Sequence, residues 1–279
     1  MEITTELPQE LKWKFTEARD EVKMFNLQKA IQLAKCSRFI YLGFSDMQDK
    51  IIELIPNARI GENWWYVERK DTQVLMAINE EETEIDIVFR GTSTVKDWMT
   101  DAQFRLTGGV HSGVRSAYMV VADDIRNYLE ELYQKKAEYS IYISGHSLGG
   151  GLAQQCASYL HDIYPMDIAG VYTYGSMKIF NREAANNYNQ RLGHLTYRCV
   201  HGADVITGLP LTLKEIGNLI YIDNNNKIWI DKCGDREANK KHHRDQIIDG
   251  FQNALTLGLL RKGHSIENYV DALEAAKKV

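Results

Sequence analysis

The feature that most constrains the fold of this chain is a serine framed by glycines between a strand and a helix. Residues 139–144 alternate apolar and polar side chains as a short strand does, and residues 148–164 have the periodicity of a helix. The pentapeptide at residues 145–149 reads Gly-His-Ser-Leu-Gly and is centred on Ser147. Chance alone supplies Gly-x-Ser-x-Gly in about one of ten chains of this length. At a strand-to-helix junction, it predicts a sharp turn that projects the Ser147 hydroxyl beyond the carboxyl end of the strand.

The glycines around Ser147 have a steric reason. A side chain at Gly145 or Gly149 would collide with the neighbouring strand and helix, so glycine at both positions lets the chain turn sharply. The first turn of the following helix also offers free N–H groups and positive dipole charge where an oxyanion would form. We therefore predict that Ser147 is a nucleophile.

The rest of the chain alternates strands with helices. The expected helices span residues 8–36, 47–54, 113–136, 148–164, 182–190 and 265–277, and the expected strands span residues 64–68, 74–78, 84–89, 139–144, 168–174, 196–201, 219–222 and 228–230. This order predicts an α/β fold with a mainly parallel central sheet and helices on both faces. The 279 residues show no seam and 44% of them are hydrophobic, so we expect one domain over residues 1–279, with residues 1–60 as a helical N-terminal extension packed on it.

Charge and hydropathy exclude some partners. The net charge of −5 argues against a nucleic-acid partner, which would need a basic face, and no apolar run reaches the roughly 20 residues of a transmembrane segment. The first 15 residues lack the apolar run of a signal peptide, and the four cysteines form no CxxC pair. Free thiols in a reducing compartment are the simplest interpretation, so we expect a cytoplasmic protein, with export without a leader as the alternative.

A serine nucleophile needs a base, and in this architecture the acid and then the histidine follow the serine along the chain. His264 follows Gly263 and opens the last expected helix, so we predict that His264 is the base. His161 lies about four turns along the helix that leaves Ser147 and cannot return to it. His194 is expected at the opposite sheet edge and His201 inside a strand. His242 and His243 are expected in a polar loop.

Asp204 is the predicted acid. It stands just past residues 196–201, at the carboxyl end of an expected strand, and that edge of a parallel sheet carries the ligand site. Asp223, Asp231 and Asp235 belong to the hairpin region and are weaker alternatives.

An ordered set of short motifs connects these residues with a known family. The motifs lie at residues 89–93 (FRGTS), 95–101 (VKDWMTD), 111–118 (HSGVRSAY), 145–150 (GHSLGG), 172–176 (YTYGS), 198–204 (RCVHGAD), 209–210 (LP) and 264–269 (HSIENY). Over residues 74–270 the chain resembles the class 3 (fungal-type) triacylglycerol lipases, which have the α/β-hydrolase fold. Each motif alone is weak, but the set in this order is specific.

The resemblance implies Ser147 as nucleophile, Asp204 as acid and His264 as base. It adds Thr92 as an oxyanion-hole residue, whose N–H and hydroxyl would act with the N–H of Leu148; such donors are worth roughly 3–4 kcal/mol each at the transition state. Two segments depart from the family pattern. Residues 175–181 read Gly-Ser-Met-Lys-Ile-Phe-Asn where the family has Gly-Ser-Pro-Arg-Val-Gly-Asn, and Thr207 replaces a proline. Neither departure touches the triad, but both bear on the shape of the acyl-binding cleft.

The segment between Thr92 and His111 corresponds to the helical lid of the family. We hypothesise that Trp98 and Met99 cover the cleft in water and turn outward in transient contact with a lipid surface. Burial of one such side chain contributes roughly 1.5–3 kcal/mol, which would hold the lid shut in water. The alternative is a fixed helix packed on the domain.

The sequence thus predicts a serine carboxylester hydrolase that acts on lipid esters through an acyl-enzyme, as an acylglycerol lipase. A phospholipase A1 or a short-chain carboxylesterase is the alternative inside the class, and a non-catalytic binding protein of the hydrolase fold is the alternative outside it. No metal or organic cofactor is expected. The nearest metal-like cluster has no recognised ligand spacing, and it comprises Asp231, Cys233, Asp235, His242 and His243.

Overall fold

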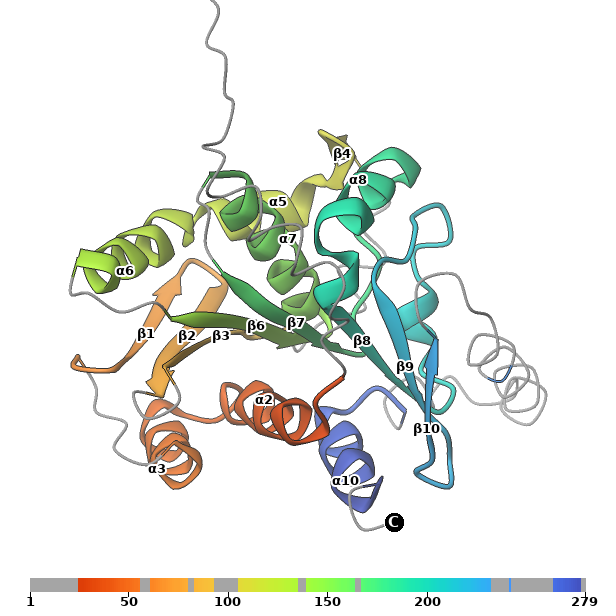
Figure 1. The fold of residues 1–279 in the computed structure, drawn as a ribbon, viewed down its shortest axis with the longest axis horizontal. Helices are drawn as coiled ribbons and strands as arrows, with labels where there is room; N and C mark the ends of the chain where they lie inside the picture. The colour runs from red at the N-terminus through yellow and green to blue at the C-terminus, as the bar shows by residue number, and fades with distance from the viewer. Residues whose placement is uncertain are drawn as a thin grey trace, which may run out of the picture.

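The computed structural model describes residues 25–55, 61–79, 83–92, 105–134, 139–163, 167–231, 241 and 263–276. The strands of its main sheet are β1 (Trp64–Arg69), β2 (Thr72–Asn79), β3 (Glu84–Phe89), β6 (Ser140–His146), β7 (Ile168–Tyr174), β8 (Thr196–His201), β9 (Asn218–Ile222) and β10 (Ile228–Asp231). They form one sheet in that order (Figure 1). β3, β6, β7, β8 and β9 run parallel, while β1, β2 and β10 pair antiparallel at the two edges. The mainly parallel sheet predicted from the sequence is therefore confirmed.

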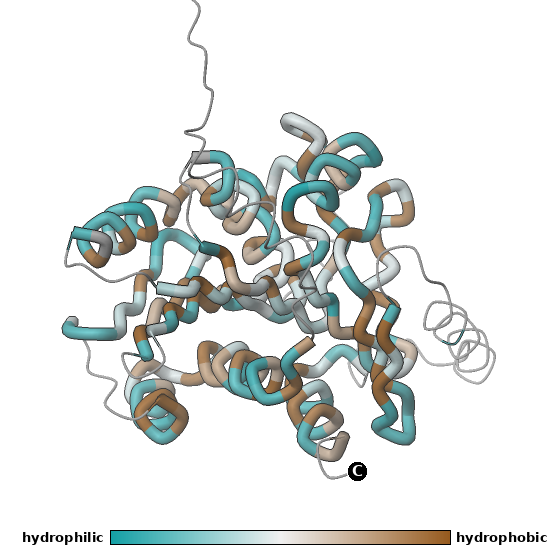
Figure 2. Tube along the Cα trace, viewed as in Figure 1, coloured by the Kyte–Doolittle hydropathy of each residue, from teal (hydrophilic) through white to brown (hydrophobic). Residues whose placement is uncertain are grey.

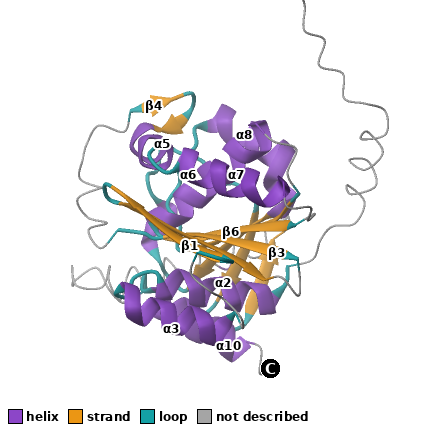
Figure 3. Ribbon diagram, turned by 90° about the vertical axis from the view of Figure 1, so that its left-hand side faces the viewer, coloured by secondary structure: helices purple, strands orange, loops and turns teal. Residues whose placement is uncertain are grey.

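Helices cover both faces of this sheet (Figures 1 and 3). One face carries α5 (Ser112–Met119), α6 (Ala122–Gln134), α7 (Leu148–Ile163) and α8 (Arg182–Leu192), and the other carries α2 (Leu27–Phe39), α3 (Phe44–Leu54) and α10 (Ile266–Ala276). Apolar stretches follow the sheet between the two helical layers (Figure 2). β7 is buried along its whole length, as a central parallel strand covered on both faces must be.

The sheet brings the ends of β6 and β8 to one edge. β7 lies between them, and all three run parallel. Ser147 directly follows β6, and Asp204 follows β8 by three residues in the sequence. The carboxyl edge of the sheet therefore collects residues that are far apart along the chain.

The prediction of a single helix over residues 113–136 is wrong. The chain forms α5 and α6 instead, with a break at Val120 and Val121, where the Val121 N–H donates to the Tyr118 carbonyl three residues earlier. Both Tyr118 and Val121 are fully buried. The change in direction lets both helices bury their apolar faces in one core cluster, which a straight helix of that length would not do.

A short hairpin was missed by the sequence interpretation. It consists of β4 (Leu106–Thr107) and β5 (Val110–His111), joined through Gly108 and Gly109. Both glycines have positive φ, +60° and +79°, which is what a two-residue type I′ hairpin turn requires. The Gly-Gly pair was the signal, but the strands beside it are too short for a recognisable alternation.

The helix expected over residues 8–36 is not continuous, because residues 25 and 26 are not helical and α2 begins at Leu27. Its N-cap is Asn26, whose side chain accepts a hydrogen bond from the Lys29 N–H at 3.0 Å. α2 lies against the sheet, and the Tyr174 hydroxyl donates to the Ala30 carbonyl at 2.6 Å. Residues 8–24 of the helix expected over residues 8–36 lie outside the described residues, and the helical N-terminal extension over residues 1–60 stays a prediction.

Candidate active site

Ser147 sits in a strained backbone conformation at the junction of β6 and α7. Its φ is +57°, a left-handed value that costs a residue with a side chain about 1–3 kcal/mol. The Ser147 N–H donates to the Tyr174 carbonyl at 2.9 Å, which ties the turn to β7. The side chain is 1% exposed.

The glycines around this turn are required by close packing. A Cβ on Gly145 would lie 2.3 Å from the backbone of Gly149, and a Cβ on Gly149 would lie 2.3 Å from the Phe89 carbonyl oxygen. Side chains cannot approach backbone atoms this closely. The steric argument made from the sequence thus holds at both positions.

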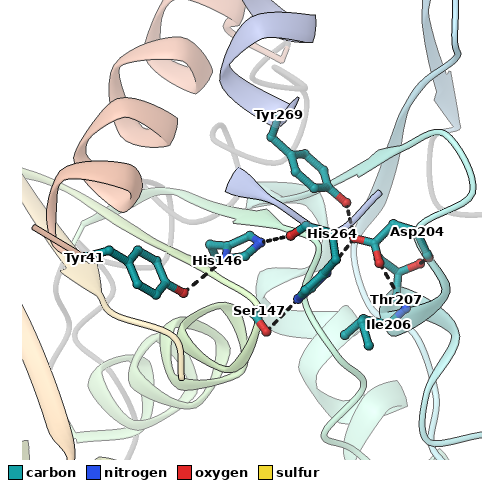
Figure 4. Close-up of polar contacts among 8 residues, drawn as sticks. All are labelled: Tyr41, His146, Ser147, Asp204, Ile206, Thr207, His264 and Tyr269. Atoms are coloured by element: carbon teal, nitrogen blue, oxygen red, sulfur yellow. Dashed lines mark hydrogen bonds and ion pairs between the residues drawn. The ribbon is translucent and has the colours of Figure 1, made fainter. Parts of the chain in front are cut away.

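The structure brings together the three residues predicted as nucleophile, base and acid (Figure 4). The His264 Nε2 lies 2.8 Å from the Ser147 Oγ, and the His264 Nδ1 lies 2.8 Å from the Asp204 Oδ2. These partners assign the tautomer, because a carboxylate can only accept: Nδ1–H donates to Asp204, and Nε2 accepts from the Ser147 hydroxyl. The Asp204 side chain is fully buried and that of His264 is 11% exposed.

Three donors orient the Asp204 carboxylate. Besides His264, the Tyr269 hydroxyl donates to Oδ2 at 2.6 Å, and the Ile206 N–H donates to Oδ1 at 3.0 Å. Burial, and then the charge of Asp204, hold the pKa of Tyr269 well above its usual value, so its hydroxyl stays protonated and donates. Thr207, which replaces the proline of the family pattern, donates its hydroxyl to the Asp204 carbonyl at 2.8 Å. This departure adds a bond within the acid loop.

Gly175 closes the site beneath Asp204 and His264. Its φ is +59°, and a Cβ there would lie 2.7 Å from the Asp204 Oδ2 and 3.1 Å from the His264 ring. A side chain at this position would push into the Asp204–His264 pair. Glycine is therefore needed both for backbone conformation and for space.

A second layer of hydrogen bonds holds the backbone of His264, and the sequence interpretation missed it. The His146 Nε2 lies 2.7 Å from the His264 carbonyl oxygen, and its Nδ1 lies 3.1 Å from the Tyr41 hydroxyl. Burial, and then the charge of His264, lower the pKa of His146 to about 3. The neutral ring therefore donates from Nε2 and accepts the Tyr41 hydroxyl at Nδ1. No sequence signal links Tyr41 to a histidine 105 residues away.

The predicted oxyanion-hole residues flank Ser147. Leu148 is the first residue of α7, so its N–H is one of the donors that a helix start leaves free. Gly91 approaches Ser147 from β3, because a Cβ on Gly91 would lie 3.3 Å from the Ser147 Cβ. Thr92 follows Gly91 and is half-buried. Trp98 and Met99, the predicted lid residues, lie outside the described residues.

The weaker alternatives for the acid and the base lie elsewhere in the structure. The Asp223 carboxylate accepts from the Asn225 N–H, the Lys227 N–H and the Trp229 indole, so it organises the β9–β10 turn. The His201 ring packs at 5.9 Å from the Tyr269 ring. His161 lies on α7, His194 lies in the 3-10 turn before β8, and Asp231 ends β10. Asp235, His242 and His243 lie outside the described residues.

The described residues hold no group of three or more histidine, cysteine or carboxylate side chains placed to bind a metal ion. Among the helices that the structure describes, none is long and apolar enough to cross a membrane.

The family model "Lipase (class 3)" matches residues 87–214. A secreted mono- and diacylglycerol lipase of Fusarium solani is 29% identical over 191 residues, which are 66% of this chain and 54% of that protein. One of Penicillium camembertii is 29% identical over 188 residues, 64% of this chain and 58% of that protein. The chain thus spans just over half the length of these curated relatives.

The solved structure of lipase II from Rhizopus niveus superposes with a TM-score of 0.68 at 20% identity. It covers 80% of this chain and 92% of that chain. This likeness confirms the α/β-hydrolase fold.

The expectation of a cytoplasmic protein is wrong, because the relatives from Fusarium solani and Penicillium camembertii are named secreted lipases. The cysteine argument was uninformative for a physical reason. Cys36, Cys156 and Cys199 are free and fully buried, and buried thiols behave as small apolar side chains in any compartment.

The matched residues 87–214 include Ser147 and Asp204, whereas His264 lies beyond that range. The resemblance to the class 3 lipase family that the sequence motifs indicated is therefore confirmed.

Proposed function

We propose that this protein is a serine carboxylester hydrolase that acts on lipid esters, in particular acylglycerols. The observation that carries the proposal is the continuous hydrogen-bonded array from the Ser147 hydroxyl through the His264 ring to the Asp204 carboxylate. The names of the two fungal relatives, mono- and diacylglycerol lipases, support the substrate class.

The geometry supports a two-stage acyl transfer. The His264 Nε2 takes the proton as the Ser147 Oγ attacks the ester carbonyl, and Asp204 stabilises the imidazolium that forms. The imidazolium then gives its proton to the departing alcohol oxygen, leaving an acyl-Ser147 ester. Water, deprotonated by the same nitrogen, attacks this ester, releases the acid and restores the serine hydroxyl. In both stages the carbonyl oxygen carries negative charge next to the start of α7, where we propose Leu148 and Thr92 as its donors.

An organophosphonate ester tests the nucleophile directly. We expect mass spectrometry to find the phosphonyl group on Ser147, and we expect Ser147→Ala to show neither labelling nor ester turnover. Ser140→Ala is the matched control, because Ser140 begins the same strand and bonds to Asp167. Labelling that persists in Ser147→Ala would refute the assignment. An unlabelled, inactive wild type would favour a non-catalytic binding protein.

Substrate series separate the members of the class. We expect hydrolysis of mono- and diacylglycerols to exceed that of phospholipids and of short p-nitrophenyl esters. A preference for the sn-1 ester of a phospholipid would instead identify a phospholipase A1, and activity confined to short soluble esters would identify a carboxylesterase. The proposed movable cover formed by Trp98 and Met99 predicts a rise in rate as a substrate passes its solubility limit, whereas a fixed helix predicts none.

A further inference from the structure

A cavity of about 460 Å³ lies outside the catalytic array, between the last turns of α2, the helix α3 and the start of α10. This volume is within the range of about 300–1,000 Å³ that small-molecule sites occupy. Part of its wall is apolar and comes from Phe39, Leu42 and Leu54. The cavity therefore combines space with a surface that suits a hydrocarbon chain.

The same cavity carries cationic side chains, of which one is available to a ligand. The Lys35 ammonium is paired with Glu274 at 2.6 Å, and the Lys50 ammonium with Glu53 at 2.8 Å. Half-buried Arg38 lies 5.1 Å from the Phe39 ring centroid, and no carboxylate in the described part of the chain forms an ion pair with it. A guanidinium in this position offers the two parallel donors that a carboxylate accepts.

Tyr41 forms another part of the cavity wall and connects it with the active site. Its hydroxyl lies 3.1 Å from the His146 Nδ1, and His146 in turn holds the His264 carbonyl (Figure 4). The hydroxyl also lies against the loop that carries Thr92, because a Cβ on Gly91 would be 2.2 Å from it. The Tyr41 side chain thus lines the cavity and contacts both His146, which holds His264, and Gly91, which precedes Thr92.

We propose that this cavity binds a carboxylate with an apolar chain, and that its occupation favours the arrangement in which Tyr41 supports His146 and His264. The choice of ligand rests on the proposed function, because ester hydrolysis releases acids of this class. The carboxylate pairs with Arg38, and the chain lies along Phe39 and Leu54. A ligand packed beside Tyr41 restricts the ring to the position in which its hydroxyl reaches His146. The fatty acid thereby activates the enzyme from a site separate from the catalytic serine.

Calorimetry with decanoate below its micelle concentration tests the binding step without turnover. In the full-length Ser147→Ala protein we expect one site that weakens about tenfold or more when Arg38→Ala is added, because a charge-assisted contact is lost. Arg126→Ala is the matched control, since Arg126 lies on α6, on the other face of the sheet, and pairs with Asp123. Equal affinity in the Arg38→Ala protein, or equally tight binding of 1-decanol, would overturn the proposal. Neither outcome depends on esterase activity.

The coupling step is tested with a soluble acetate ester as substrate. Saturating decanoate should raise kcat about fivefold in the wild type and in Arg126→Ala, the lower end of usual coupling between sites, and should have no effect in Tyr41→Phe. A second measurement needs no variant: decanoate should bind the Ser147-phosphonylated protein more tightly than the free protein, because the phosphonyl group mimics the charged transition state that the occupied cavity favours. An unchanged rate in the wild type, or stimulation that persists in Tyr41→Phe, would refute the coupling. An unlabelled, inactive wild type would instead count against the proposed function.

Discussion

The backbone strain at Ser147 predicts that glycine at this position gives a more stable protein than alanine does. Ser147 has a φ of +57°, and its hydroxyl bonds to the His264 Nε2 at 2.8 Å. Ser147→Ala and Ser147→Gly both remove this hydrogen bond and the proposed nucleophile. Only glycine also removes the Cβ that makes a left-handed backbone unfavourable.

The magnitude follows from two opposing terms. A left-handed conformation costs an L-residue roughly 1–2 kcal/mol, which glycine avoids. Glycine also gives the unfolded chain more freedom, which lowers stability by about 0.4–1 kcal/mol relative to alanine. We therefore expect the unfolding free energy of Ser147→Gly to exceed that of Ser147→Ala by about 1 kcal/mol, or roughly 2–4 °C in Tm for a chain of this size.

Urea unfolding and calorimetry of the two variants give this difference directly. Ser144 supplies the control, because it is fully buried in β6 and is not among the residues with positive φ. There the sign should reverse, with Ser144→Gly less stable than Ser144→Ala by about 0.5–1 kcal/mol. Equal stabilities at position 147, or alanine more stable than glycine there, would mean that the turn is not strained and would remove the basis of the argument.

Three further predictions concern the surroundings of His264. Gly175→Ala should lower the unfolding free energy by at least about 2 kcal/mol and reduce kcat strongly, because its Cβ would lie 2.7 Å from the Asp204 Oδ2 at a φ of +59°; denaturant unfolding and initial rates measure both. Tyr269→Phe removes a buried 2.6 Å bond to Asp204 and should destabilise the protein by about 1.5–3 kcal/mol, with kcat falling more than KM changes; an unchanged kcat would show that Tyr269 does not position the acid. The pKa of His146 is lowered to about 3, so between about pH 3 and the unfolded value near 6.5 the unfolded chain binds the extra proton. Stability should therefore fall as pH decreases through that window, by roughly 1.4 kcal/mol per unit for this group, and His146→Gln should show a shallower slope in urea titrations at several pH values.

The central part of the fold could be predicted because its sequence carries strong periodic signals. The strands Ile168–Tyr174 and Thr196–His201 match the expected ranges at both ends. The chain order of serine, acid and histidine then selected Asp204 and His264, because the ends of parallel strands meet at one sheet edge. In the structure, His264 lies within hydrogen-bonding distance of Ser147, and Asp204 lies within hydrogen-bonding distance of His264.

Features that depend on contacts between distant elements could not be predicted in this way. The break between α5 and α6 arises because Tyr118 and Val121 both turn into one core, while the helical periodicity runs on through the break. Tyr41 lies past the end of α2, and nothing in its local pattern distinguishes it from a surface tyrosine. Its hydroxyl meets His146 only because α2 packs across the face of β6.

Ion pairs between α2 and β3 explain the position of α2. They therefore also bear on the Tyr41–His146 contact near the candidate active site. The Lys29 ammonium is 5% exposed and lies 2.7 Å from Asp86 and 2.8 Å from Glu84, both on β3. Burial opposes the charge, but the two carboxylates outweigh it and raise the pKa of Lys29. A buried ion pair of this kind adds little net stability compared with apolar packing, yet removal of one partner costs about 3–5 kcal/mol. Its main effect is therefore on placement: the ion pair holds α2 against β3, and in this position Tyr41 reaches His146.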